Sequence, residues 1–97
     1  MRLTADEVAA IKAAAQEAFG ADAIVRLFGS RIDDVRRGVD IDLHLSLHRE
    51  PTREARAHFR KLLDRQVGER EYDIVIAMAD RAATPIDRRA MAEGVVL

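Results

Sequence analysis

One stretch near the middle constrains the fold of this 97-residue chain more than any other. It begins as Leu27-Phe28-Gly29-Ser30-Arg31 and ends as Asp40-Ile41-Asp42-Leu43. An apolar run ends in a Gly-Ser turn, and a second apolar run opens with two alternating carboxylates. Because side chains alternate along a strand, Asp40 and Asp42 share one face and Ile41 takes the other. The pattern predicts two strands joined by a charged loop, with two acids held side by side.

This pairing of acids with a Gly-Ser turn has a chemical meaning. Two carboxylates so close repel each other unless a cation lies between them, and a divalent metal with oxygen ligands is the usual solution. A Gly-Ser turn after a strand offers backbone N–H groups and a hydroxyl, which suit a phosphate. A metal together with a phosphate indicates a nucleotide. The alternative is that Gly29-Ser30 is an ordinary turn and that both acids are solvated.

The same residues carry a resemblance. Gly29-Ser30-Arg31, with nine residues between Ser30 and the start of Asp40-Ile41-Asp42-Leu43, resembles the signature of the minimal nucleotidyltransferases. These are the small branch of the DNA polymerase beta nucleotidyltransferase superfamily. The better-known form of the signature has one more residue in this interval and a Gly or Ser just before the first Asp, where this chain has Val39.

The resemblance implies a magnesium-dependent enzyme and a role for each residue of the signature. It implies that the catalytic acids, which are also the metal ligands for Mg²⁺, are Asp40, Asp42 and Asp73. It further implies that the phosphates of ATP are bound by Gly29 and Ser30, with Arg31 holding the turn or the triphosphate. For Asp73, which begins an otherwise apolar run, the alternatives are a structural ion pair or a place at the wet end of the strand.

The resemblance also implies a partner. Similar prokaryotic proteins are antitoxin subunits beside a helical ribonuclease toxin called HEPN, and they modify a tyrosine hydroxyl of that toxin with AMP. Larger relatives carry an added helical domain that binds the acceptor. This sequence has none, so we expect a partner chain to complete the site or to be the substrate, in a hetero-oligomer. The alternatives are an antitoxin that acts by contact alone, and a small-molecule nucleotidyltransferase with a separate substrate-binding subunit.

Composition bounds the other function classes. The net charge of −1 gives no general attraction to nucleic acid or to an anionic membrane. The absence of cysteine excludes a disulfide framework, a thiolate zinc site and a thiol nucleophile. No apolar run is long enough to cross a bilayer, and the charged N-terminal residues are unlike a signal peptide, so we expect a cytoplasmic protein. We expect residues 1–97 to form one domain.

Periodicity and capping signals predict the remaining elements. We expect helices at Thr4–Phe19, at 52–67 and after Thr84-Pro85, and strands at Ala23–Phe28, Asp40–Leu47 and Glu71–Met78. In the last helix, the side chains expected to pack inward are Ile86, Ala90 and Met91. This order predicts an α/β (α+β) domain with a small mixed sheet and helices packed on one face. The resemblance implies a polymerase-beta-like nucleotidyltransferase fold.

Three other features leave alternatives open. The second strand has a polar face, predicted to be wet or functional, made of Asp40, Asp42, His44 and Ser46. On it we expect His44 to be a solvated or hydrogen-bonded residue and not a metal ligand. Arg26 is expected at the sheet edge in preference to a place facing the acids, and Arg36 is a weaker phosphate candidate than Arg31. The apolar end at 95–97 should pack down or meet another chain.

Overall fold

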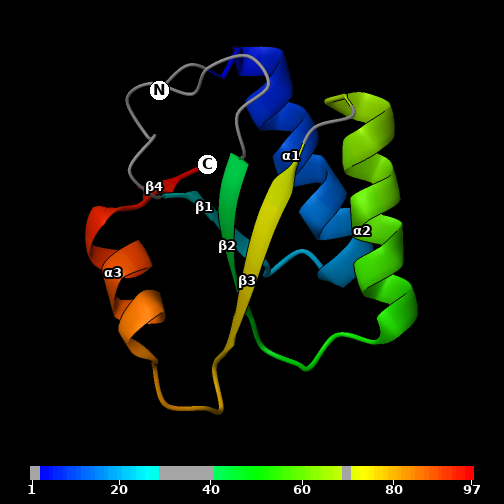
Figure 1. The fold of residues 1–97 in the computed structure, drawn as a ribbon. Helices are drawn as coiled ribbons and strands as arrows, with labels where there is room; N and C mark the ends of the chain where they lie inside the picture. The colour runs from blue at the N-terminus through cyan, green and yellow to red at the C-terminus, as the bar shows by residue number, and fades with distance from the viewer. Residues whose placement is uncertain (1–2, 29–40, 69–70) are drawn as a thin grey trace.

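The computed structural model describes residues 3–28, 41–68 and 71–97. These residues form three helices and four strands (Figure 1). In chain order they are α1 (Ala5–Phe19), β1 (Ile24–Leu27), β2 (Ile41–Leu47), α2 (Arg53–Gln66), β3 (Tyr72–Met78), α3 (Pro85–Glu93) and β4 (Val95–Val96). The six predicted elements are confirmed, and their ends lie close to the predicted ones. The strand β4 was not predicted.

The strands form one mixed sheet with the order β3-β2-β1-β4 within the described part of the chain. The inner strand β2 pairs antiparallel with β1 and parallel with β3, and β4 adds to β1 in the antiparallel sense. Parallel strands cannot be joined by a tight turn, and α2 provides the crossover between β2 and β3. The predicted mixed sheet is therefore confirmed.

The first helix begins and ends as its sequence predicts. The backbone N–H of Thr4 donates to the Glu7 carboxylate at 3.0 Å, and the backbone N–H of Glu7 donates to the Thr4 hydroxyl at 3.0 Å. This reciprocal pair is a capping box. Gly20 ends the helix with a φ of 112°, a conformation that L side chains rarely adopt.

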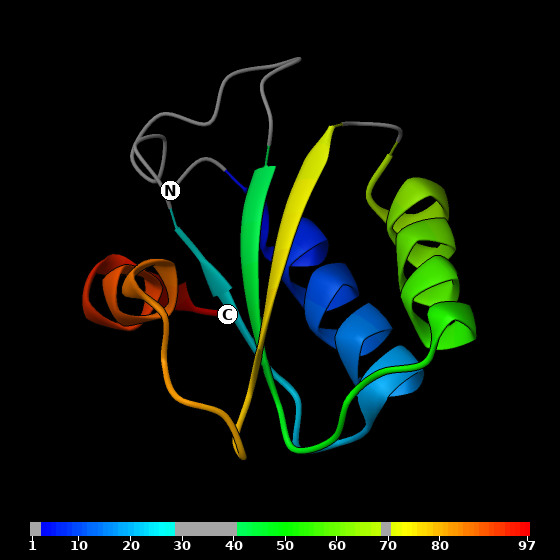
Figure 2. The ribbon, with the colours of Figure 1, turned by 60° about the horizontal axis from the view of Figure 1, so that its bottom comes forward.

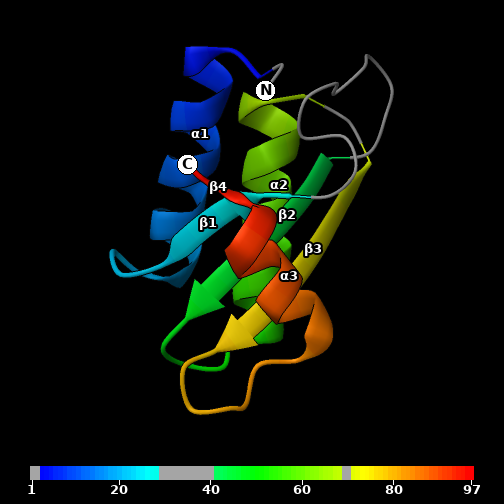
Figure 3. The same ribbon diagram turned by 90° about the vertical axis from the view of Figure 1, so that its left-hand side faces the viewer.

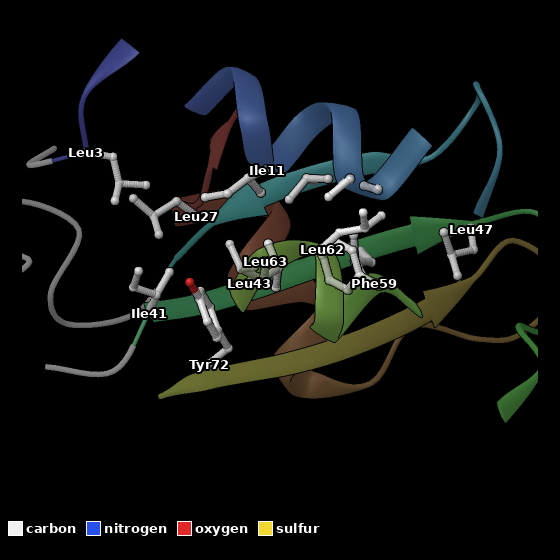
Figure 4. Close-up of a cluster of buried hydrophobic side chains, with 14 residues drawn as sticks. Leu3, Ile11, Leu27, Ile41, Leu43, Leu47, Phe59, Leu62, Leu63 and Tyr72 are labelled. Carbon is white, nitrogen blue, oxygen red and sulfur yellow. The ribbon is translucent and has the colours of Figure 1, made fainter. Parts of the chain in front are cut away.

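The hydrophobic core lies between the sheet and the two helices α1 and α2. Leu43 and Leu45 of β2 are fully buried against this layer, as are Ile11 of α1 and Leu63 of α2. Figure 4 shows Leu43, Ile11 and Leu63 among the apolar side chains between the helices and the strands. The apolar periodicity of the sequence predicted this face because removal of apolar surface from water is the main driving force of folding.

The third helix lies on the opposite face of the sheet, as Figure 2 shows. The expectation that all helices pack on one face is therefore wrong. The physical reason is a polar attachment: Nε2 of His44 on β2 lies 2.9 Å from Oδ1 of Asp87 on α3. The polar side of β2, which we expected to be wet or functional, is covered by α3 at His44.

The inward face of α3 also differs from the prediction. Ala90 is fully buried, as expected, but Ile86 and Met91 are 45% and 54% exposed. Asp87 takes the inward position instead and is only 5% exposed. The prediction failed because it assumed that α3 is attached to the sheet by apolar contacts.

The backbone of the apolar end joins the sheet beside β1, but the side chains of Val95 and Val96 remain 38% and 60% exposed. The alternative of packing down is therefore met only in part. Val95 and Val96 pair with Leu27 and Arg26, and the backbone N–H of Leu97 donates to the Val25 carbonyl at 2.9 Å. Gly94 permits this close return, because a Cβ there would collide with the carbonyl oxygen of Ala90. In the described ranges, none of the helices combines the length and the apolar character needed to cross a membrane.

Candidate functional site

Two of the predicted acids lie side by side at one end of the sheet. Asp42 of β2 and Asp73 of β3 are direct partners in the parallel register. Partners in a parallel pair point to the same face, and neighbouring strands lie about 4.8 Å apart. Asp42 is half-buried and Asp73 is exposed. The structure thus brings these two carboxylates together, while their catalytic role stays a prediction.

The end of β1 lies next to Asp42. The backbone N–H of Phe28 donates to the carbonyl of Asp42 at 3.1 Å, and the backbone N–H of Ile41 donates to that of Glu71 at 2.9 Å. Phe28 directly precedes Gly29-Ser30 in the sequence. The remaining predicted site residues lie outside the described part of the chain: Gly29, Ser30, Arg31, Arg36 and Asp40.

The donor set suits a hard divalent cation. Carboxylate oxygens are the ligands that magnesium prefers. Asp42 and Asp73 supply two such groups from neighbouring strands. In the ranges that the structure describes, no group of three or more His, Asp or Glu side chains is arranged to hold a metal. The predicted third ligand, Asp40, lies outside those ranges.

His44 lies two residues beyond Asp42 on the same face of β2 and is completely buried. An ionised carboxylate can only accept, so the Nε2–H of His44 donates to Asp87 across 2.9 Å. The ring of Phe28 stands edge-on to the imidazole at a centroid distance of 6.1 Å. The prediction of a hydrogen-bonded His44 is confirmed. Its Nδ1 is buried and has no hydrogen-bond partner among the residues that the structure describes.

The carboxylate of Asp87 joins α3 to the sheet. Burial raises the pKa of Asp87, but hydrogen bonds from Thr84 and His44 outweigh it and leave the pKa below its ordinary value. The backbone N–H of Thr84 donates to Oδ2 of Asp87 at 2.9 Å. Sequence analysis identified Thr84 as a cap but missed Asp87, although Thr-x-x-Asp is a recognisable capping pattern.

Arg26 has a structural role, as the sequence favoured, but it lies on the inner strand β1 and not at the sheet edge, because β4 adds outside β1. Its Nη1 donates to Oγ of Ser46 at 2.9 Å, in a half-buried position. Ser46 lies four positions along β2 from Asp42. This hydrogen bond therefore directs the guanidinium along the sheet away from the two carboxylates.

A pocket of about 280 Å³ lies between α3 and the far ends of β2 and β3. Figure 3 shows α3 crossing in front of these strand ends. Most of its lining is apolar, with Ser46 and Asp87 among the polar groups. Because Asp42 and Asp73 stand at the beginnings of the same two strands, this pocket is separate from the paired acids.

Comparison with known proteins adds no family assignment. No family model matches the chain. No curated protein matches it significantly either.

Proposed function

We propose that this chain is a magnesium-dependent nucleotidyltransferase of the minimal, polymerase-beta-like type. It transfers AMP from ATP to a hydroxyl, expected to be a tyrosine, of a HEPN toxin partner and thereby acts as the antitoxin. The observation that carries the proposal is the direct pairing of Asp42 with Asp73 beside the end of β1. Asp40, two residues before Asp42 in the sequence, would supply a third carboxylate.

The acids bind and orient the reacting groups. Asp42 lies on β2, with Asp40 two residues before it in the sequence, and Asp73 lies on the neighbouring strand β3. Together these carboxylates would hold Mg²⁺, which when bound neutralises phosphate charge and lowers the pKa of an attacking hydroxyl. The half-buried state of Asp42 favours tight binding of a cation because the local dielectric is lower than in water.

The residues that follow β1 in the sequence would bind the phosphates of ATP. The hydrogen bond from Phe28 to Asp42 fixes the end of that strand beside the acids. Gly29 and Ser30, the next residues in the sequence, would bind the beta and gamma phosphates through backbone N–H groups and the hydroxyl. The acceptor oxygen then bonds to the alpha phosphorus, the bond to the bridging oxygen breaks, and pyrophosphate leaves while the hydroxyl proton is released.

The position of Asp73 supports a large acceptor. Asp73 is exposed and lies on β3, the outermost strand on its side of the described sheet. A hydroxyl carried by another protein can therefore approach the predicted third acid from outside the sheet. A small substrate would need a further enclosing surface at this place.

The test is transfer of label to the partner protein. The purified chain is incubated with Mg²⁺, ATP labelled at the alpha phosphate and the HEPN protein encoded beside it. We expect labelled partner with the natural chain. Asp42→Asn and Asp73→Asn should each lower the rate by about 100-fold or more, as does removal of a group that stabilises transition-state charge. Asp64→Asn, at an exposed position on α2, is the matched control and should leave the rate unchanged.

Two outcomes of the same experiment would contradict the proposed function. Absence of label, with the partner bound and silenced equally by the natural chain and both variants, would contradict the enzymatic proposal. It would leave an antitoxin that acts by contact alone. Equal labelling by the natural chain and by Asp42→Asn would show that the transfer does not use these acids.

A further inference from the structure

The two edges of the described sheet differ greatly in length. The edge strand β4 has two residues, whereas β3 at the other edge has seven, all paired with β2 in an unbroken register. Figure 1 looks onto the β3 edge, and no labelled helix or strand lies in front of it. Proteins usually shorten, bend or block an edge strand, because its free backbone groups can pair with another chain. The β4 edge is short, but the β3 edge is long, and no helix or strand of the described residues covers its middle.

The composition of β3 also favours pairing. Apart from Asp73, its side chains are all apolar, and the strand contains no proline and no lysine. Residues 74–78 are each half-buried, on both faces of the strand. A long apolar edge strand of this kind is the usual sequence and structural signal for edge-to-edge association. Pairing would remove its half-exposed side chains from water.

The register shows which backbone groups point outward. Ile41 donates to the carbonyl of Glu71, and Ala79 donates to the carbonyl of Leu47, so the odd-numbered residues of β3 face β2. The even-numbered residues therefore direct their N–H and C=O groups away from the sheet. At the two ends, these outward carbonyls accept from the Arg60 side chain at 3.5 Å and from the Arg81 backbone at 3.1 Å. In the middle of the edge, the outward N–H and C=O groups are those of Ile74 and Ile76.

We propose that two copies of this chain pair through their β3 strands, antiparallel, around a twofold axis at Val75. The two sheets then form one continuous sheet. The partner is a second copy because the strand is complementary to itself in this register. Ile74 lies opposite Ile76 of the other copy in a hydrogen-bonded pair, and Asp73 lies opposite Ala77, so no like charges face each other.

This arrangement covers the β3 edge, so in the dimer the proposed acceptor would reach the exposed Asp73 from the face of the sheet and not from its edge. A twofold axis perpendicular to the sheet keeps both copies of Asp73 on the same face. They are offset by four positions, or about 13 Å along the strands. Both sites would thus open on one side of the dimer.

The first test uses charge at the axis. Light scattering on a sizing column, at micromolar concentrations, should give a dimer for the natural chain. Val75→Lys and Val75→Glu should each be monomeric, because residue 75 then faces a like charge on the other copy. An equimolar mixture of the two variants should form a dimer again. The matched controls, Val96→Lys and Val96→Glu on the short edge, change a side chain that is 60% exposed and should remain dimeric.

The second test uses the backbone. Ile76→Pro removes an N–H that points outward and keeps the bonds between β3 and β2, so it should give a folded monomer with an unchanged circular dichroism spectrum. A monomeric natural chain would overturn the proposal, as would dimers that persist in the Val75 variants. Failure of the lysine and glutamate variants to pair with each other would overturn the twofold axis at Val75. Dissociation caused by the Val96 variants would show that the interface lies at β4 and not at β3.

Discussion

At the scale of single residues, two pairs of polar side chains lie over the same face of the sheet, and they have different functions. Asp42 and Asp73 are near enough to share a cation, and one of them is exposed. His44 and Asp87 are both buried and bind each other. The local Asp-x-Asp pattern predicted only that Asp40 and Asp42 share a face, and Asp73 was expected beside them because the resemblance implies a third acid there. The second pair joins residues 43 positions apart, and no local pattern connects them.

The pair of His44 and Asp87 makes stability depend on pH in the acid range. The folded state holds the pKa of Asp87 below its ordinary value, so the carboxylate contributes stability above the unfolded pKa of about 3.9. That contribution is lost as the pH falls through the lower, folded pKa. Asp87→Asn removes it, so the free energy of unfolding of this variant should fall less steeply below pH 5 than that of the natural chain.

Urea unfolding at a series of pH values from 7 to 3 measures this difference. At pH 7 the variant should be less stable by about 1–3 kcal/mol, because His44 and Thr84 lose a charged acceptor. Asp64→Asn, at an exposed position, should follow the natural curve. Parallel pH curves for the natural chain and Asp87→Asn would contradict the role assigned to Asp87.

At the scale of elements, α3 shows how a short helix is held in place by its first turn. Thr84 and Asp87 form a capping box, and Pro85 begins the helix. The sequence predicted where α3 begins, because capping chemistry is local. It did not predict which face turns inward, since α3 buries only Asp87 and Ala90 and has no wide apolar stripe. The two-residue strand β4 is too short to show any periodicity.

Removal of the two threonine caps should therefore have unequal effects. Thr4→Ala removes the cap of α1 and should cost about 1 kcal/mol. Thr84→Ala should cost more, about 2 kcal/mol, because Thr84 also holds the carboxylate that binds His44. Both free energies come from urea unfolding at neutral pH. Equal losses would show that the capping box of α3 is independent of its attachment to the sheet.

At the scale of the whole molecule, the sheet separates two environments. The face under α1 and α2 is an apolar core, and its members could be predicted from the periods of two and 3.6 residues in the sequence. The face toward α3 combines polar side chains of β2 with apolar side chains of β3, and alternation predicted its polar part but not that α3 covers it. The paired acids stand at one end of this face. The turn predicted to bind phosphate, with Asp40, lies outside the described residues.

The central claim is that Asp42 and Asp73 form one cation site, and paramagnetic broadening by Mn²⁺ tests it most directly. With isotope-labelled protein and ATP present, the account predicts early loss of the amide signals of Leu43 and Ile74, which follow the two acids. Signals of Asp22 and His48, at the opposite end of the sheet, should persist, and the Asp42→Asn, Asp73→Asn double variant should lose the effect. Broadening centred on another acidic group, or retained in the double variant, would contradict the claim.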